Sequence, residues 1–290
     1  MAASTVVPHV FLTRFNLPAN RVERSIFSDE WLTARMELFE KYTVPSVRAQ
    51  LTVGEVVWII YLGDSTPDWL RQRMSELADE LPVLPIYLGG PLDPTELRGH
   101  VREAVGKADG PVVTSNLDND DGLAKDYVRR VRELTPESRP GAVYLTMGLI
   151  RREGDVYLRR DEVNAFVAVV DDLGSDDFRT CWAGFHNQLE EQMPVVRDAG
   201  TPAWLQVVHG RNVSNRVGGR LTPASNHASL YAGLLEDVPA PSVGARARDL
   251  LSQPARTARD RVVRPTAVVL RRLIGLERYE SLKMAVQRRH

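Results

Sequence analysis

The first 130 residues alternate apolar runs with amphipathic segments, and this alternation restricts the fold more than any other feature of the chain. Residues 56–62 form a continuous apolar run, as expected of a strand that is buried on both faces. Residues 6–15, 83–88 and 111–117 predict three further strands, and segments with helical spacing separate them. Strands that alternate with helices favour a mostly parallel sheet flanked by helices. The sequence therefore predicts an α/β, Rossmann-like fold.

Three aspartates, Asp118, Asp120 and Asp121, follow the fourth predicted strand within four positions. Uncompensated carboxylates this close raise one another's pKa, so such a cluster is usually solvated or neutralised by a cation. Carboxylate oxygens suit Mg²⁺ or Mn²⁺, and strand-to-helix junctions are where open α/β sheets bind ligands. The alternative is an acidic turn that caps the following helix, since a helix N-terminus favours aspartate. Both interpretations stay open at this point.

Two other predicted strands also end in polar residues, at Thr13–Asn16 and at Asp64–Thr66. We expect these ends and the segment from Asn116 to Asp121 to gather along one edge of the sheet, because parallel strands share their carboxyl edge. The chain contains neither a G-x-G-x-x-G motif after the first strand nor a P-loop. If phosphates bind here, the compensating charge must therefore come from a metal ion.

Charge is unevenly distributed along the 290 residues, although the net charge is only -1. Residues 241–290 carry 12 Arg and Lys against four Asp and Glu, and they include a predicted helix over 265–286. Such a basic tail can bind an anionic lipid surface, bind nucleic acid, or dock on the acidic body of the protein.

A single cysteine, no signal peptide and no bilayer-spanning apolar stretch predict a cytoplasmic protein, at most peripheral to the inner face of the membrane.

The pattern changes after residue 140, where several short strands predict a meander or a mixed sheet. One of them ends in Asp171 and Asp172, and a later strand ends at His209. An imidazole at that position could complete a metal site with Asp118 and Asp120. The alternative for His209 is a histidine that is hydrogen-bonded in an ordinary loop.

Five segments carry motifs in a fixed order: Phe11-Leu-Thr-Arg-Phe-Asn16, Trp31-Leu with Arg35 and Pro45-Ser-Val47, Trp58-Ile-Ile-Tyr61 with Asp64, Thr114-Ser-Asn-Leu-Asp-Asn-Asp-Asp121, and Trp204-Leu-Gln-Val-Val-His-Gly210 with Asn212 and Asn215. Together, over about residues 8–235, they resemble the putative rhamnosyltransferase family of GT-A type glycosyltransferases. The resemblance implies a GT-A type mixed sheet flanked by helices. It divides the chain into a glycosyltransferase domain over 1–240, with a nucleotide-sugar-binding half (1–135) and an acceptor half (136–240), and a basic helical extension over 241–290.

The resemblance also implies roles for individual residues. Asp118-Asn119-Asp120 corresponds to a D-x-D motif that holds Mn²⁺ or Mg²⁺ against the donor diphosphate, Asp121 extends it, and His209 takes the place of a metal-ligand histidine. Asp64 matches the position that contacts the nucleotide base, and the remaining donor-binding positions lie at strand ends: Thr13, Arg14, Asn116 and Asp118.

The implied activity is transfer of a sugar, with rhamnose favoured, from a dTDP- or UDP-sugar to a glycan or lipid-linked acceptor, without a nucleic-acid partner. An inverting enzyme also needs a carboxylate that deprotonates the acceptor, for which Asp171 and Asp172 are candidates, unless they form an acidic turn. Two rivals remain: a sugar nucleotidyltransferase, although residues 11–20 lack the expected glycine-rich loop, and a non-catalytic carbohydrate- or membrane-binding protein of the same fold.

Overall fold

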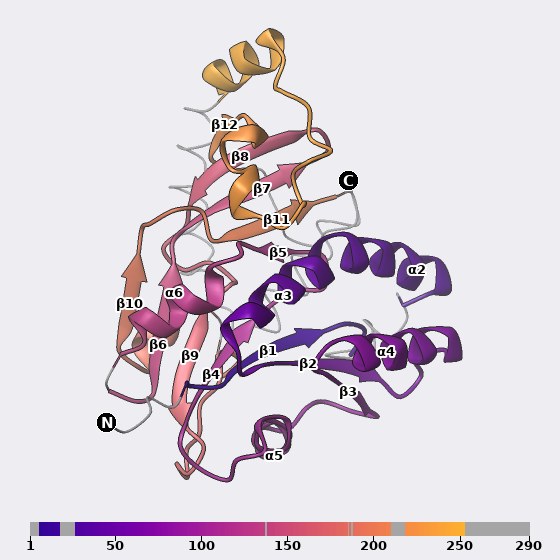
Figure 1. The fold of residues 1–290 in the computed structure, drawn as a ribbon, viewed down its shortest axis with the longest axis vertical. Helices are drawn as coiled ribbons and strands as arrows, with labels where there is room; N and C mark the ends of the chain where they lie inside the picture. Colours follow the sequence, from indigo (N-terminus) through magenta and orange to yellow (C-terminus); the bar gives the residue numbers. More distant parts are fainter. Residues whose placement is uncertain are drawn as a thin grey trace, which may run out of the picture.

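The computed structural model describes residues 6–17, 27–136, 138–184, 186, 188–209 and 218–252. Figure 1 shows how the strands and helices are arranged. In chain order the elements are β1 (His9–Arg14), α2 (Asp29–Leu38), η1 (Phe39–Thr43), α3 (Val44–Gln50), η2 (Leu51–Val53), β2 (Val56–Gly63), α4 (Asp68–Glu80), β3 (Val83–Leu88), α5 (Pro94–Val105), β4 (Pro111–Asn116), β5 (Gly122–Leu123), α6 (Tyr127–Leu134), β6 (Gly141–Leu145), β7 (Met147–Arg152), β8 (Asp155–Arg160), β9 (Ala168–Asp172), η3 (Leu189–Glu191), β10 (Val195–Asp198), β11 (Trp204–Val208), β12 (Arg220–Thr222), η4 (Ala224–Asn226) and η5 (Ala228–Leu230).

A seven-stranded sheet with the order β10-β6-β9-β4-β1-β2-β3 forms the centre of the molecule. The four strands of the N-terminal part, β1 to β4, are parallel to one another, as the alternation of strands and helices predicts. The strand β9 runs antiparallel to both β4 and β6, so the sheet is mixed. The α/β fold with a mostly parallel, helix-flanked sheet is therefore confirmed. Strands from before and after residue 136 share this one sheet.

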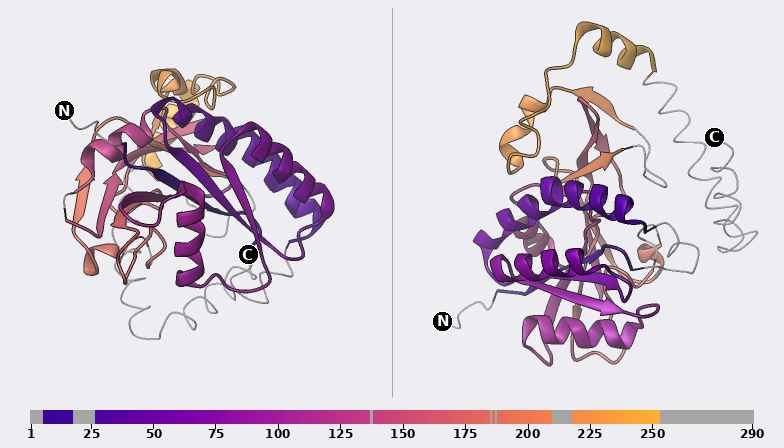
Figure 2. Two further views of the ribbon diagram at one scale, coloured as in Figure 1. Left: turned by 60° about the horizontal axis from the view of Figure 1, so that its bottom comes forward. Right: turned by 90° about the vertical axis from the view of Figure 1, so that its right-hand side faces the viewer.

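Apolar side chains pack on both faces of the large sheet. Alternate residues of β1 point to opposite sides: Phe11 belongs to the core under α2 and α4, and Leu12 belongs to the core under α5. Figure 2 shows α4 and α5 on opposite faces of the sheet. Because helices cover both faces, the central strands are inaccessible to water, and only their ends can carry a site.

The second sheet has the order β12-β8-β7-β11-β5 and packs on its own apolar cluster. Of the two alternatives predicted for the second half, a meander or a mixed sheet, the structure has the mixed sheet. The strands β7 and β8 form an antiparallel hairpin in this second sheet, whereas β6 and β9 join the large sheet. The short strand β5 pairs with β11, so the chain after the acidic cluster enters the second sheet before the helix α6 begins at Tyr127.

The helix α2 begins at a side-chain cap, where the Ser28 hydroxyl accepts a hydrogen bond from the Trp31 N–H at 3.3 Å. A π-helical turn, η1, follows α2, and α3 then starts with Pro45 in its first turn, where proline costs no hydrogen bond. The residues from Asp29 to Gln50 therefore form one bent helical arm over the sheet.

Most of the predicted basic tail lies outside the described residues, including the helix expected over 265–286. Residues 243–252 are helical and expose Val243, Leu250 and Leu251. Among the helices that the structure describes, none is long and apolar enough to cross a membrane.

Gly148 in β7 makes room for the Trp204 ring of the neighbouring strand β11, because a Cβ at this position would lie 2.0 Å from that ring. That ring cannot easily move, since its indole N–H donates to the Leu145 carbonyl at 2.9 Å and the ring stacks on Phe166. We expect Gly148→Ala to lower the free energy of unfolding by about 1–3 kcal/mol. Gly99→Ala in α5, where the added methyl meets no atom within 4 Å, should raise it by about 0.4–1 kcal/mol. Urea unfolding measures both, and a Gly148→Ala protein as stable as the wild type would contradict this packing.

Candidate active site

The polar strand ends that the sequence indicates meet at one edge of the large sheet. The strands β1, β2 and β4 are parallel and in register, with Arg14 opposite Tyr61 and Leu12 opposite Asn116. Their carboxyl ends therefore carry Arg14, Asp64 and the acidic turn along the same edge. The expectation of a shared edge is confirmed, and this edge is the candidate active site.

Hydrogen bonds to β1 hold the acidic turn in place. The Thr13 hydroxyl donates to the Leu117 carbonyl at 2.6 Å, and the Asn119 amide donates to the Phe15 carbonyl at 2.8 Å and the Arg14 carbonyl at 3.2 Å. The turn closes with the Asp121 N–H on the Asp118 carbonyl. The side chain of Asn119 thus points back into the protein and holds the turn on β1. Its two neighbours, Asp118 and Asp120, remain as the candidate ligands of the site.

Asp121 connects the turn to the second sheet. Its Oδ1 accepts a hydrogen bond from the Val207 N–H at 2.8 Å, and its backbone carbonyl accepts one from the Thr43 hydroxyl. His209 lies two residues after Val207, directly after the end of β11. Its Nε2 lies 2.9 Å from Asp120 Oδ2. The carboxylate of Asp121 thus brings a histidine that follows β11 against an aspartate that follows β4.

Asp120 is the most crowded carboxylate of the site. Besides His209, its Oδ2 contacts the Arg35 Nη1 at 2.5 Å, and its side chain is only 7% exposed. The Arg35 guanidinium stacks on the Trp31 ring, one helical turn earlier in α2, at 4.8 Å from the ring centroid. The helical arm over the sheet therefore delivers a positive charge to the acidic turn.

The three aspartates differ in their electrostatic surroundings. Burial disfavours the charged form of Asp120, but the hydrogen bond to His209 and the charge of Arg35 outweigh it and lower the pKa of Asp120. Burial and the neighbouring charges of Asp120 and Asp118 raise the pKa of Asp121 well above its usual range. Crowding by protein atoms and the charge of Asp120 raise the pKa of Asp118 to about 6, although solvent reaches this side chain. The turn is thus a partly neutralised anion.

These residues can be tested for their fit to a divalent cation. Within the part of the chain that the structure describes, no three His, Cys, Asp or Glu side chains stand grouped so as to hold a metal ion. The donor set is nevertheless of the right chemistry, with carboxylates beside an imidazole. Asp121 Oδ2 is buried without a hydrogen-bond partner, which a bound cation beside Asp120 would compensate. The chemical types of these side chains therefore suit a divalent cation, but the Arg35 guanidinium contacts Asp120 Oδ2, one of the oxygens that would bind the ion.

Arg14 and Trp182 form the side of the site next to Asp118. The Arg14 guanidinium lies over the Trp182 ring at 4.5 Å from its centroid, and its charge acts on Asp118. The indole N–H of Trp182 donates to Asn116 Oδ1 at 2.7 Å, and the Asn116 amide donates to the Ala165 carbonyl at 3.0 Å and, more weakly, to Asp118 at 3.4 Å. Asn116, predicted to bind the donor, thus holds the Trp182 ring beside Asp118.

Two other residues expected at the donor site occupy different surroundings. Thr13 is fully buried, and its hydroxyl both donates to Leu117 and accepts from the Trp58 indole at 2.9 Å. Its side chain thus faces the core with Phe11 and cannot reach a ligand, which corrects the prediction for Thr13. Asp64, by contrast, is exposed at the end of β2, where a ligand can reach it.

Asp171 and Asp172 do not lie at this edge. The strand β9 is antiparallel to β4 and pairs Asp171 with Val112 and Asp172 with Pro111, about six residues or ~20 Å along β4 from Asp118. Their carboxylates accept hydrogen bonds from the Arg179 and Gly174 N–H groups at 2.7 and 2.8 Å. They form the acidic turn that the sequence left open as an alternative, and this placement argues against a role as catalytic base.

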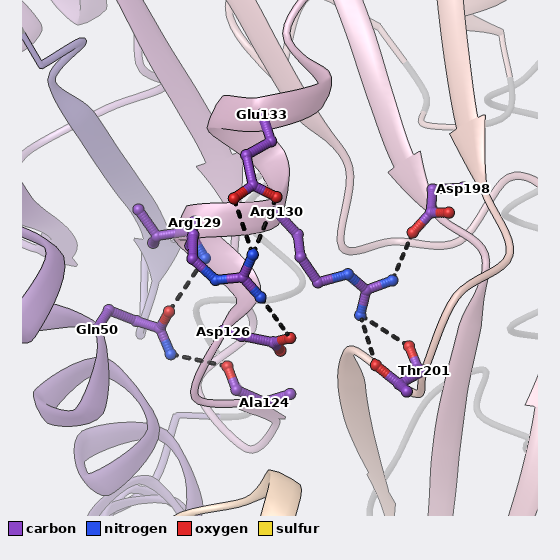
Figure 3. A network of polar contacts seen from close by, with 9 residues as sticks. Gln50, Ala124, Asp126, Arg129, Arg130, Glu133, Asp198 and Thr201 are labelled. Carbon is purple, nitrogen blue, oxygen red and sulfur yellow. Dashed lines mark hydrogen bonds and ion pairs between the residues drawn. The ribbon is translucent and has the colours of Figure 1, made fainter.

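The Asp118–Asp121 cluster does not cap the next helix either. The N-cap of α6 is Asp126, which makes no side-chain capping bond. Figure 3 shows how the segment after the turn is fixed instead. Gln50 of α3 donates to the Ala124 carbonyl at 2.9 Å and accepts from the Val128 N–H, and Arg130 of α6 pairs with Asp198 at 2.6 Å.

Sequence reasoning missed the roles of Arg35 and Trp182: it met Arg35 only as part of a motif and did not single out Trp182. The available signal for Arg35 was its spacing of four residues from Trp31 in an amphipathic helix, since such residues are neighbours on one helix face. Nothing in the sequence indicates that Trp182 lies near Asn116. The motif residues after His209, from Gly210 to Asn215, lie outside the described residues.

Comparisons with known proteins identify similar sequences and folds. Residues 8–221 match the model of the family described as "Putative rhamnosyl transferase". No curated protein sequence matches the chain significantly. Among solved structures, the chain is similar to the mannosyltransferase PcManGT from Pyrobaculum calidifontis in complex with GDP-Man and Mn²⁺, at 12% identity over 97% of this chain and 84% of that chain, with a TM-score of 0.43. It is also similar to S. aureus TarS 1-349, at 7% identity over 69% of this chain, 60% of that chain and a TM-score of 0.42. The inositol-1-phosphate CTP transferase from T. maritima matches at 10% identity over 81% and 98% of the two chains, with a TM-score of 0.39.

The raised pKa of Asp118 predicts a pH dependence of stability in EDTA. The folded protein holds the proton of Asp118 up to a pKa of about 6, above the usual 3.8, so this contribution to stability is present below about pH 4 and is lost as pH rises through about 6. We therefore expect the melting temperature of Asp118→Asn, relative to that of the wild type, to be higher at about pH 7 than at about pH 4. Asp79→Asn, on the exposed face of α4, is the control. Differential scanning calorimetry measures the difference, and an equal difference at both pH values would contradict the assignment.

Proposed function

The chain belongs to the putative rhamnosyl transferase family, and from this premise we propose that it transfers a sugar from a nucleoside-diphosphate donor in a metal-dependent reaction. The observation that carries the proposal is the contact of His209 with Asp120 at 2.9 Å, at the edge where β1, β2 and β4 end. Rhamnose is the favoured sugar, from a dTDP or UDP donor, and a glycan or a lipid-linked glycan is the acceptor.

The edge offers separate places for the parts of such a donor. Asp64 is exposed at the end of β2, and we assign to it the contact with the nucleotide base. Asp118, Asp120 and His209 would hold Mn²⁺ or Mg²⁺, with Asp121 Oδ2 able to contribute. Arg14 stands beside Asp118, with its guanidinium stacked on Trp182, where it can pair with an anionic group of the donor.

Departure of a nucleoside diphosphate builds negative charge on the leaving phosphate. A metal ion, when bound, supplies Lewis-acid stabilisation of that charge. The chain's own contribution is a pre-oriented positive group: the Arg14 guanidinium is held over the Trp182 ring. Groups that are already in place need no reorganisation during the reaction, which is what makes electrostatic stabilisation effective.

Calorimetric titration with dTDP, UDP, GDP and ADP tests this function. We expect one of these nucleotides to bind in the presence of Mn²⁺ and not in EDTA, and Asp120→Ala to weaken that binding by at least 10- to 100-fold. Asp79→Ala in α4 is the matched control, since it removes an exposed carboxylate away from the site. A nucleotide that binds equally well in EDTA, or equally well to Asp120→Ala, would contradict the metal-dependent donor site.

We further propose that the basic segment over 241–290 makes a peripheral contact with an anionic membrane. The described part of this segment exposes Val243, Leu250 and Leu251 from a helix that also carries Arg246 and Arg248, as in helices that lie on lipid surfaces.

Sedimentation with vesicles that contain phosphatidylglycerol tests this contact. The full chain should sediment with them, and the double variant Leu250→Glu and Leu251→Glu should lose roughly 100-fold or more in apparent affinity, because each leucine that inserts is worth ~1.5–3 kcal/mol. Neutral phosphatidylcholine vesicles are the control. Equal sedimentation of the two proteins would dispose of the contact.

A further inference from the structure

One oxygen of the acidic turn contacts two cationic or potentially cationic groups. Asp120 Oδ2 lies 2.5 Å from Arg35 Nη1 and 2.9 Å from His209 Nε2. The side chains of Arg35 and Asp120 are 11% and 7% exposed, so water screens this pair little. Arginine is effectively always protonated, so in this structure its positive charge compensates the Asp120 carboxylate.

This contact is incompatible with a metal ion on the same oxygen. A divalent cation would lie about 2.0–2.2 Å from its carboxylate oxygen, and a guanidinium nitrogen cannot remain in contact with that oxygen while the ion is there. The two positive groups would also repel each other strongly at this separation in a poorly hydrated site. Either the guanidinium or the metal ion occupies Asp120 Oδ2 at any one time.

The fold keeps Arg35 in position. Arg35 lies on α2, whose neighbouring residues Leu32 and Met36 are buried in the core, and the Trp31 ring packs on the guanidinium at 4.8 Å. The helix starts at a capped Ser28 and continues through η1 into α3, where Thr43 donates to the Asp121 carbonyl. Thus the element that supplies the guanidinium is itself bonded to the acidic turn.

We propose that Arg35 occupies the place of the divalent cation on Asp120 in the free protein, so that the metal ion alone binds weakly. This inference rests on the proposed function, in which the same oxygen serves a metal-bound donor. The donor's diphosphate resolves the competition, because it brings oxygen ligands for the metal and a doubly charged partner for the released guanidinium. Metal and nucleotide then bind together, and Arg35 becomes a positioning residue for the leaving phosphate.

Titration of the protein with Mn²⁺, followed by the electron paramagnetic resonance signal of the free ion, tests the competition without any nucleotide. The neutral variants Arg35→Gln and Arg35→Met should bind Mn²⁺ at least tenfold more tightly than the wild type, since they leave Asp120 without its guanidinium. Arg35→Lys keeps the charge and should remain weak. Arg73→Gln, which removes an exposed arginine paired with Glu40 at 2.5 Å, is the control and should match the wild type.

Two measurements keep the test valid if a variant folds poorly. Arg35→Met preserves an unbranched stem that can pack on Trp31, and a rise of its melting temperature with Mn²⁺ that exceeds the rise in wild type supports the proposal. Adding Asp120→Asn to Arg35→Gln should abolish the gain in Mn²⁺ affinity. Persistence of the gain in the double variant would place the new ion elsewhere and overturn the proposal.

The proposal is also overturned if both neutral variants bind Mn²⁺ no more tightly than the wild type. The nucleotide titration then separates the two claims. If the wild type still binds a nucleotide only with Mn²⁺, the metal-dependent function stands and only the competition is rejected. If nucleotide binding needs no metal, the metal dependence is rejected as well.

Discussion

The architecture of the site depends on the hydrogen bonds that hold the acidic turn after β4. Asn119 ties the turn to the end of β1 through the Phe15 carbonyl, and Asp121 ties it to β11 through the Val207 N–H. One turn of four residues thus connects the large sheet, which provides a ligand edge, to the second sheet, which provides His209. The Asp121 contact therefore helps to keep His209, which follows β11, beside Asp120.

The site also illustrates how a cluster of carboxylates is made compatible with folding. Three aspartates in a poorly hydrated turn are costly unless they are paired or protonated. The structure distributes this cost: Arg35 and His209 compensate Asp120, Asp121 bonds a backbone N–H and has a raised pKa, and Asp118 stays in contact with solvent. The same compensation makes Asp120 less available to a metal ion, so stability of the free protein and metal affinity oppose each other here.

Much of the N-terminal half could be predicted from the sequence, because buried parallel strands and amphipathic helices have distinct periods. The bounds of β3 agree with the prediction to the residue, and the shared edge of β1, β2 and β4 follows from their common direction. Periodicity carries no information on strand direction, so the antiparallel course of β9, and with it the position of Asp171, could not be predicted. Thr13 could have been recognised as inward-facing, since it lies on the same face of the extended segment as Phe11 and Phe15. The pairing of Arg35 with Asp120, which joins residues 85 positions apart, leaves no trace in a single sequence.

The central claim is that the turn over 118–121 and His209 form the place where a metal ion meets the donor's diphosphate. The most direct measurement is a crystal structure with Mn²⁺ and the nucleoside diphosphate that the protein binds, with the ion located by its anomalous scattering. Our account predicts a manganese peak between the carboxylates of Asp118 or Asp120 and His209, with the Arg35 guanidinium withdrawn from Asp120 and directed to the diphosphate. A manganese peak elsewhere, or a bound nucleotide with the contact between Arg35 and Asp120 intact and no ion beside it, would contradict the account.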